Sequence, residues 1–439
     1  MTPVVLAHGI GTRGDLPLPA WMFAYGAGFA VVASFLLLRL LWPAPRLARA
    51  AIGGALGGWT RPAGSAGEAT LRTAGLAALA VTVWAAFAGG DTTVDNIAPV
   101  ALFVAFWVGV QVVSVVLGDV WATANPLDTI TAAIHRVSGR AHEPSAGADH
   151  PWGAWPAVVT LGAFLWFELA YHDPSSPRAV GTFVVLYSAT VLVGAARFGR
   201  GWIANGDGFA ALFALLGKIG VFHRDDDGQL RMRPPLAGLT TIEPRPGLEA
   251  LVLVTLGATS FDGMTRTSFW LDVLGSSEGW SATLINTVGL LWVIGIVAAL
   301  YRAAMWGAAK VVGGDSRALA TQFLHALVPI VFAYALAHYF SLLMFEGQTF
   351  LALASDPLGR GWDLFGTAHW EINFRLVTTT TIAWVQAGAI AGGHVAGVIT
   401  AHDRAVELYD HRTAVASQVP VLGVMVVYTV GGLLLLLNA

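Results

Sequence analysis

Residues 317–346 read RALATQFLHALVPIVFAYALAHYFSLLMFE, and no Asp, Glu, Lys or Arg interrupts this stretch between its first and last residues. A hydrocarbon core about 30 Å thick requires roughly 20 apolar residues in one helix, so the stretch is long enough to cross a membrane. Comparable apolar segments recur along the chain. They predict ten membrane-spanning helices, at 21–41, 73–90, 97–117, 154–171, 179–196, 249–264, 282–301, 319–345, 376–400 and 416–437.

The composition of the whole chain supports a membrane protein. Of its 439 residues, 56% are hydrophobic and 12% are charged, whereas a soluble domain carries about 25% charged residues. We therefore expect an all-α, polytopic helix bundle in contact with the lipid bilayer. The chain has no cysteine, which excludes disulfides, thiolate metal ligands and cysteine nucleophiles. No nucleotide-binding, nucleophile-elbow or nucleic-acid-binding motif is present, so a nucleic-acid partner is not expected.

The distribution of Lys and Arg predicts the orientation of the helices. Nineteen of the 24 lie in the odd-numbered connections, and five lie at the N-terminus or in the even-numbered connections. Because cytoplasmic loops are enriched in Lys and Arg, both termini are expected outside, in a multi-pass protein of a bacterial cytoplasmic membrane. The formal charge then divides into −7 outside and +4 inside. We expect an external arm at 1–20 and one bundle at 21–437, with inner loops at 118–153 and 197–248 and an outer loop at 346–375.

Few ionisable side chains lie at membrane depth, where each is costly and usually marks a functional site. His338 lies thirteen residues, or about 20 Å, above His325 on the helix quoted above. Asp262 lies thirteen residues above Glu249 on another helix, and therefore at the depth of His338. These two side chains predict a site near the outer leaflet.

Histidine and carboxylates without cysteine are the ligands of catalytic zinc, manganese or non-haem iron. We therefore predict a divalent-metal site in the outer half of the membrane, with Asp262 or Glu346 as the general base. No short metal-binding motif is present, so the ligands would have to come from different helices and loops. The simpler interpretation is a rim of solvated acids with structurally paired histidines. The candidate ligands near the outer surface are His338, Asp262, His8, His369 and Glu371.

The N-terminal segment adds a separate hypothesis about copper. Leu6 and Ala7 before His8 resemble the end of a signal peptide, although the apolar run at 4–7 is shorter than the core of one. Cleavage after Ala7 would leave His8 as the first residue, and its amine and imidazole together form a chelate that suits copper. The simpler interpretation is a short external arm with a solvated histidine.

A second pair of histidines is expected near the inner surface. His325 and His394 lie at equal depth on neighbouring antiparallel helices, where they could share a metal or, as a minor option, ligate a haem. The simpler interpretation is that each ring is hydrogen-bonded to a neighbouring hydroxyl or carbonyl group. Together with His338, these rings could also bind a proton or metal ion in turn as it crosses the membrane through a transporter. Gln386 and the run Thr378–Thr381 lie between the two levels.

Six stretches stand out together: AHGIGTRGDLPLP (7–19), GDVWATANPLDTI (118–130), GLTTIEPRPGLEA (238–250), TSFDGMTRTSFW (259–270), HALVPIVFAYALAHYFSLLMFEGQ (325–348) and AGGHVAGVITAHDRAVELY (391–409). They resemble a little-characterised group of bacterial, mostly actinobacterial, integral membrane proteins, some of which are named fenitrothion hydrolase-like. The resemblance implies hydrolysis of an aryl phosphorothioate triester, an apolar substrate that would reach the site through the outer leaflet. A bound metal would lower the pKa of its water towards 7 in such a reaction.

Two functions from different classes therefore follow from the sequence. One is a metal-dependent hydrolase of apolar, organophosphorus-like esters with its site near the outer leaflet. The alternative is a transporter, or another membrane protein that handles protons or metal ions, which uses His325, His338 and His394. The two differ in structure, because a transporter needs a polar connection between the outer and inner levels and a hydrolase does not.

Overall fold

The computed structural model describes residues 18–60, 65–138, 150–225 and 227–438. About 75% of the chain is helical, which confirms the predicted helix bundle. Within the described residues, eight helical segments are long and apolar enough to cross a membrane. They are α1 (Ala20–Leu41), α3 (Ala66–Ala88), the continuous α4–η1–α5 (Ile97–Val100, Ala101–Gly109, Val110–Leu117), α9 (Pro177–Phe198), α14 (Gly279–Val312), α15–η4–α16 (Ser316–Phe323, Leu324–Leu327, Val328–Ser355), α17 (Thr379–Leu408) and α18–α19 (His411–Ser417, Val419–Asn438).

Two of the ten predicted spans form helices that are shorter or less apolar than these eight. The helix α8 (Trp155–Leu169) has 15 residues and is about 22 Å long. The helix α12 (Leu248–Thr265) carries several hydroxyl and acidic side chains and is buried along nearly its whole length against α8, α14, α16 and α19. A helix buried on all sides belongs to the interior of a bundle. The structure thus supports eight spans, and the number ten remains a prediction.

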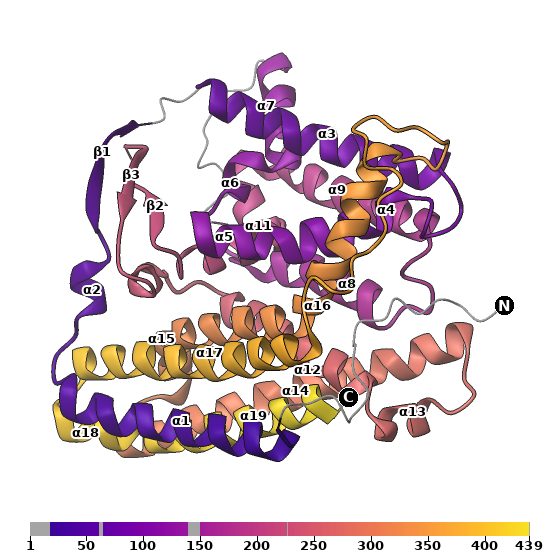
Figure 1. Ribbon diagram of the computed structural model, residues 1–439. Coiled ribbons are helices and arrows are strands. Elements are labelled where there is room, and N and C mark those ends of the chain that lie inside the picture. Colours follow the sequence, from indigo (N-terminus) through magenta and orange to yellow (C-terminus); the bar gives the residue numbers. More distant parts are fainter. Residues whose placement is uncertain (1–17, 61–64, 139–149, 226, 439) are drawn as a thin grey trace.

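Most of the long helices run side by side across the view of Figure 1. Helices α1, α17 and α19 pack against one another, and α16 packs along α17. Glycines make the contact between α16 and α17 close: a Cβ atom at Gly393 would overlap Ala333, and one at Gly397 would lie 2.8 Å from the carbonyl oxygen of Ala326. Small residues allow membrane helices to approach one another in this way.

The connections between the helices are more ordered than the sequence predicted. They include a small antiparallel sheet in the order β1–β3–β2, with Gly54 of β1 opposite Met232 of β3, which the all-α prediction did not contain. The expected inner loops also hold short helices. The remaining elements are α2 (Leu47–Ala50), β1 (Gly54–Thr60), α6 (Trp121–Ala124), α7 (Pro126–Val137), η2 (Arg200–Trp202), α10 (Ile203–Gly206), α11 (Gly208–Gly217), β2 (Phe222–Arg224), β3 (Gln229–Met232), η3 (Ala237–Thr241) and α13 (Ser268–Leu274).

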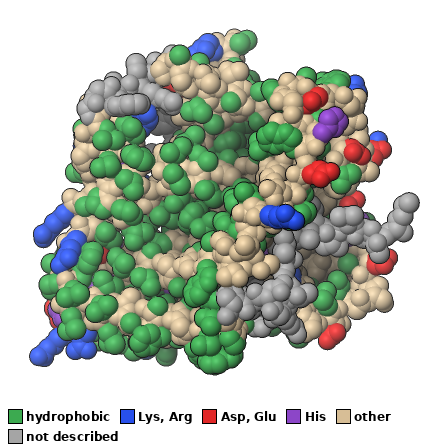
Figure 2. Space-filling model, viewed as in Figure 1, with side chains coloured by type: hydrophobic (Ala, Val, Ile, Leu, Met, Phe, Trp, Pro, Cys, Tyr) green, Lys and Arg blue, Asp and Glu red, His purple; other side chains and the backbone are tan. Residues whose placement is uncertain are grey.

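The two ends of the bundle differ in charge. Figure 2 shows acidic side chains gathered towards the right-hand end of the visible face, and Lys and Arg side chains projecting from the left-hand end. We call the first the acidic end, which includes α13 and the segment 356–378, and the second the basic end, which includes α2, α18 and the sheet. The segment at the acidic end is shorter than the outer loop predicted at 346–375. Helix α16 continues through Ser355 because no helix-breaking residue precedes Asp356 and Pro357.

The stretch that spans residues 317–346 is divided into helical pieces. The 3-10 turn Leu324–Leu327 separates α15 from α16, and Pro329 stands in the first turn of α16, where its missing N–H group is tolerated. A second irregularity faces α16: the nine residues Ala101–Gly109 form a π-helix, η1. Because π-helical turns often occur at functional sites, the surroundings of η1 and α16 are the first place to look for one.

Candidate functional site

The structure brings together Asp262 and His338, the two side chains for which the sequence predicts the same depth in the membrane. Asp262 lies in the last turn of α12 and His338 in the middle of α16, with 7% and 4% of their surfaces exposed. The Nε2 atom of His338 lies 2.8 Å from the Oδ2 atom of Asp262. The two groups are close enough for an ion pair, although they lack the alignment of a hydrogen bond. A charge on Asp262 or on His338 therefore lies directly beside the other side chain.

Three further side chains complete this group. The hydroxyl of Tyr339 lies 3.0 Å from Oδ2 of Asp262 and 3.2 Å from Oε1 of Glu168, so it can donate its hydrogen bond to either carboxylate. Arg266, one turn after Asp262, places its guanidinium 3.8 Å from Oδ1. We call these five residues, Glu168, Asp262, Arg266, His338 and Tyr339, the acidic-end cluster.

The net charge of the acidic-end cluster would become zero if the cluster bound one proton. Two carboxylates face one guanidinium, so the cluster carries one negative charge while His338 is neutral. An uncompensated buried charge costs several kcal/mol. One proton, on His338 or on a carboxylate, would cancel it. The cluster is therefore suited to binding one exchangeable proton.

A small cavity of about 80 Å³ reaches Glu168 at the acidic end. Thr93 and Ser175 line it from the connections between helices, and Glu346 and Thr349 line it from α16. The Oε2 atom of Glu168 and the hydroxyl of Thr349 are buried and have no hydrogen-bond partner among the described residues. A cavity of this size and polarity has room for water that could satisfy both atoms.

Glu168 stands where this cavity meets the acidic-end cluster. Its Oε1 atom accepts a hydrogen bond from Tyr339, whereas its Oε2 atom has none. The apolar part of the cavity wall comes from α4 and the π-helix η1, through Pro99, Val100, Phe103 and Val104. Glu168 is thus the one member of the cluster that also lines the cavity.

The remaining predicted ligands near this end do not join the cluster. Glu346 lines the cavity about two turns of α16 beyond His338. His369 and Glu371 are exposed on the segment after α16, and His8 lies outside the described residues. Within the described part of the chain, no group of three or more His, Asp or Glu side chains could hold a metal ion. The described residues thus do not assemble the expected ligands, and the divalent metal stays a prediction.

The two histidines nearer the basic end have backbone partners. The ring nitrogens of His325 lie 3.1 Å from the carbonyl oxygen of Gln322 and 3.4 Å from that of Thr400. The Nδ1 atom of His394 lies 2.8 Å from the carbonyl oxygen of Ile390, one turn earlier on α17. These contacts match the simpler interpretation, in which each ring is hydrogen-bonded to a neighbouring carbonyl group.

No family model, curated protein or solved structure matches this chain. The resemblance to hydrolase-like membrane proteins therefore stays a prediction. What the chain does has to follow from the geometry of its own side chains.

Hydroxyl groups lie between the acidic-end cluster and His394. The Oγ atom of Ser260 is 2.6 Å from the hydroxyl of Tyr428, whose ring centre lies 6.0 Å from that of His394 and 5.6 Å from that of Tyr334. The run Thr378–Thr381, which was expected to connect the two levels, instead begins α17 at a mostly exposed position. Polar groups between the levels therefore come from α12, α16 and α19.

Three members of the cluster were not among the predicted site residues. Arg266 follows Asp262 by four residues, and this spacing on a helix was a usable signal for a contact. Tyr339 is adjacent to His338, but neighbouring residues on a helix point in different directions. Glu168 comes from α8, and no local pattern shows that α8 and α16 meet α12 at the same level.

Proposed function

We propose that this chain is a proton-coupled membrane transporter in which the acidic-end cluster binds and releases one proton. The observation that carries the proposal is the placement of Glu168, with one carboxylate oxygen at the cavity and the other at the hydroxyl of Tyr339. The same hydroxyl reaches Asp262, which lies 2.8 Å from His338. Buried ionisable groups in contact with one another are the usual parts of proton relays in membrane proteins.

The proton follows a short route through these groups. A hydronium ion that reaches the cavity from the outside protonates Glu168 at Oε2 and becomes water, and rotation of the carboxyl group presents that proton to Tyr339. Tyr339 then passes its own hydroxyl proton to Asp262 and accepts the one from Glu168. The pair Asp262 and His338 holds the arriving proton, which leaves the cluster uncharged. Neutralisation removes an electrostatic penalty and so favours a different packing of α12 against α16.

The proposal assigns the acidic end to the outside of the cell. This orientation agrees with the enrichment of Lys and Arg at the other end of the bundle. It places both termini outside and the cavity at the outer surface, in a cytoplasmic membrane. The ten-span topology, with α8 and α12 crossing the membrane inside the bundle, belongs to the same proposal.

Infrared difference spectroscopy tests the proton-binding step. Spectra of the protein in lipid, recorded between about pH 5 and about pH 8, are expected to show a carboxyl band that changes with pH. Glu168→Gln and Asp262→Asn should each remove or shift that band. Glu371→Gln, an exposed acid at the same end, serves as the matched control and should leave it unchanged. A spectrum that neither buried variant alters would overturn the proposal.

Proton flux tests the transport step. Proteoliposomes under an inside-negative potential are expected to acidify faster than empty liposomes, and Asp262→Asn should abolish most of that difference. His394→Gln should retain it, because His394 is bound to a backbone carbonyl. Loss of flux in His394→Gln and retention in Asp262→Asn would assign the route to the other end of the bundle.

The hydrolase that the resemblance implies is a second candidate function. Since the described residues assemble no metal-binding group, we derive no step through a metal ion. The cavity beside Glu168 and Glu346 is small, at about 80 Å³, whereas pockets for small molecules usually have about 300–1,000 Å³. Release of a phenol from an aryl phosphotriester by the same purified protein would favour the hydrolase over the transporter.

A further inference from the structure

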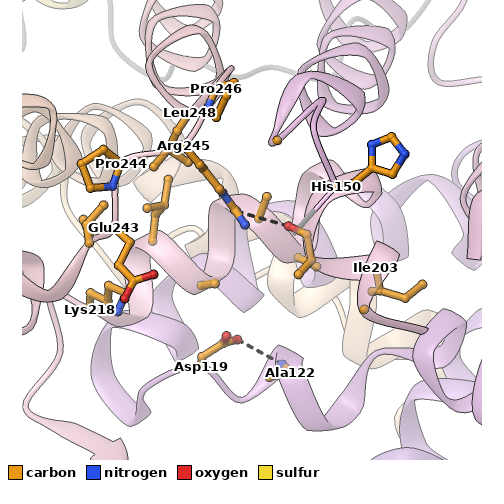
Figure 3. A pocket seen from close by; sticks show the side chains of 18 of the residues that line it. Asp119, Ala122, His150, Ile203, Lys218, Glu243, Pro244, Arg245, Pro246 and Leu248 are labelled. Atoms are coloured by element: carbon orange, nitrogen blue, oxygen red, sulfur yellow. Dashed lines mark hydrogen bonds between the residues drawn. The ribbon is translucent and has the colours of Figure 1, made fainter. Parts of the chain in front are cut away.

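A second, much larger cavity lies at the basic end of the bundle. Its volume is about 1020 Å³, and its walls come from the connection before α6, from η2, α10 and α11, and from the segment 241–248 that leads into α12. Figure 3 shows Arg245 extending into the middle of this space, with Lys218 and Glu243 on one side and His150 on the other. We call it the basic-end cavity. Nothing in the proton-binding role of the acidic-end cluster uses it.

Arg245 is held in place by neutral groups. One of its Nη atoms donates a hydrogen bond of 2.7 Å to Oδ1 of Asn205, which is fully buried, and the other donates one of 3.2 Å to the carbonyl oxygen of Ala204. No Asp or Glu of the described residues forms an ion pair with it. Burial without a compensating negative charge lowers the pKa of Arg245. Among the described residues, the guanidinium is therefore held in place and has no carboxylate in an ion pair with it.

The other two cations of the cavity, Arg200 and Lys218, have carboxylates near them. Arg200 makes two hydrogen bonds to Asp128, both of 2.5 Å. Lys218 donates a hydrogen bond of 2.8 Å to the hydroxyl of Thr241. Burial and Arg233 lower the pKa of Lys218, while Glu243 and Asp119 oppose that effect. Among the described residues, Arg245 is thus the cation of this cavity for which no carboxylate partner is present.

We propose that the basic-end cavity binds a phosphate-bearing ligand, with the phosphate group on the guanidinium of Arg245. An arginine fork matches the oxygens of a phosphate group and binds two of them at once. Asn205 and Ala204 fix the fork before the ligand arrives, so little side-chain freedom is lost on binding. The space around Arg245 admits a molecule larger than the phosphate group itself. The ligand is either a soluble phosphate compound or the headgroup of an anionic lipid.

Calorimetric titration of the full chain in nanodiscs of uncharged phosphatidylcholine tests the first source. Inorganic phosphate, added at constant ionic strength, is expected to bind. Arg245→Gln should weaken its binding by about tenfold or more, as expected for a lost charged hydrogen bond. Arg245→Lys keeps the charge but loses the two-pronged guanidinium. Its affinity for phosphate should therefore lie between that of the wild type and that of Arg245→Gln. Arg412→Gln removes an exposed cation from the same end and should bind as the wild type does.

Nanodiscs that contain phosphatidic acid test the second source. A rise in thermal stability that depends on this lipid and is lost in Arg245→Gln, without binding of inorganic phosphate, assigns the site to a headgroup. Binding of inorganic phosphate that is lost in the same variant assigns it to a soluble ligand. If Arg245→Gln does not fold, weaker binding by Arg245→Lys carries the test. Equal affinity in all Arg245 variants, or no response of the wild type to either probe, would overturn the proposal.

Discussion

The acidic-end cluster and the basic-end cavity hold the same kinds of ionisable side chain in opposite surroundings. In the cluster, Asp262 lies 2.8 Å from His338 and 3.0 Å from the hydroxyl of Tyr339, and all three side chains are buried. In the cavity, Arg245 and Lys218 face about 1020 Å³ of open space. The first arrangement leaves room for little more than a proton and water, whereas the second leaves room for a molecule.

The difference lies in what compensates each charge. Within the acidic-end cluster, carboxylates, guanidinium and imidazole contact one another, so removal of one member leaves the others buried with fewer partners. At the basic end, water or a ligand compensates Arg245, so removal of a side chain changes binding more than stability. The comparison therefore predicts a ranking of stability losses, with the cluster first.

The largest loss is expected for Asp262→Ala. It removes the charge that faces both His338 and Arg266, and breaking a buried charged pair costs about 3–5 kcal/mol. Equilibrium unfolding in mixed micelles measures the loss. Asp262→Asn should cost less, because the amide can still accept the hydrogen bond from Tyr339. Asp272→Asn, an exposed acid near the same end, should change stability by less than about 0.5 kcal/mol; a similar loss there would contradict the ranking.

Much of the fold could be predicted because length and hydropathy are local properties. The stretch 317–346 has no Asp, Glu, Lys or Arg between its first and last residues, and the structure places it in a long apolar helical segment. The features of the fold that the sequence did not predict also have physical causes. Helix α12, predicted as a span at 249–264, is not among the eight helical segments that are long and apolar enough to cross a membrane but is surrounded by other helices, and this surrounding is compatible with its hydroxyl and acidic side chains. The sheet pairs Gly54 with Met232, and such distant partners leave no periodic signal in the sequence.

The candidate site was predictable only in part. Asp262 and His338 stood out because an ionisable side chain at membrane depth is costly wherever its helix lies. Their contact, and the third partner Glu168, depend on which helices are neighbours, which the sequence does not specify. Two of the predicted metal ligands, His369 and Glu371, lie on an exposed segment far along the chain from α12.

A smaller loss is expected for Asp128→Ala at the basic end. Asp128 accepts two hydrogen bonds of 2.5 Å from Arg200 and one of 3.1 Å from Arg72, but the three side chains remain 13–24% exposed. Water can therefore replace part of what is lost, and we expect about 2 kcal/mol. Glu407→Ala breaks the more exposed pair with Arg404 and should cost less than about 1 kcal/mol. A loss at Asp128 as large as that at Asp262 would break the comparison.

Substitution of the histidines outside the cluster should lower the stability of the protein still less. His394→Gln removes a hydrogen bond to the carbonyl oxygen of Ile390, and a neutral hydrogen bond contributes about 1 kcal/mol. His338→Gln should cost more, because it removes the buried imidazole that lies 2.8 Å from Asp262. Nitrogen-15 spectra of labelled histidine add a check, since His394 should carry its proton on Nδ1 in order to donate to that carbonyl. A larger stability loss at His394 than at His338 would reverse the assignment of structural and functional histidines.

The smallest effect is a change of stability with pH at Asp119, which lines the basic-end cavity and accepts a hydrogen bond of 3.0 Å from the N–H group of Ala122. Although Asp119 is exposed to the open cavity, desolvation by the surrounding walls raises its pKa to about 6, against about 3.9 in an unfolded chain. The folded protein therefore holds this proton more tightly than the unfolded chain does. Relative to Asp119→Asn, the wild type should lose stability as the pH rises from about 4 to about 6. The loss should be modest because the cavity admits water to the carboxylate.

Thermal unfolding midpoints of the wild type and of Asp119→Asn across this pH range measure the loss, with Asp272→Asn as the control for removal of a carboxylate. A difference that stays constant with pH would show that the basic-end cavity solvates Asp119 fully, which would sharpen its contrast with the acidic-end cluster.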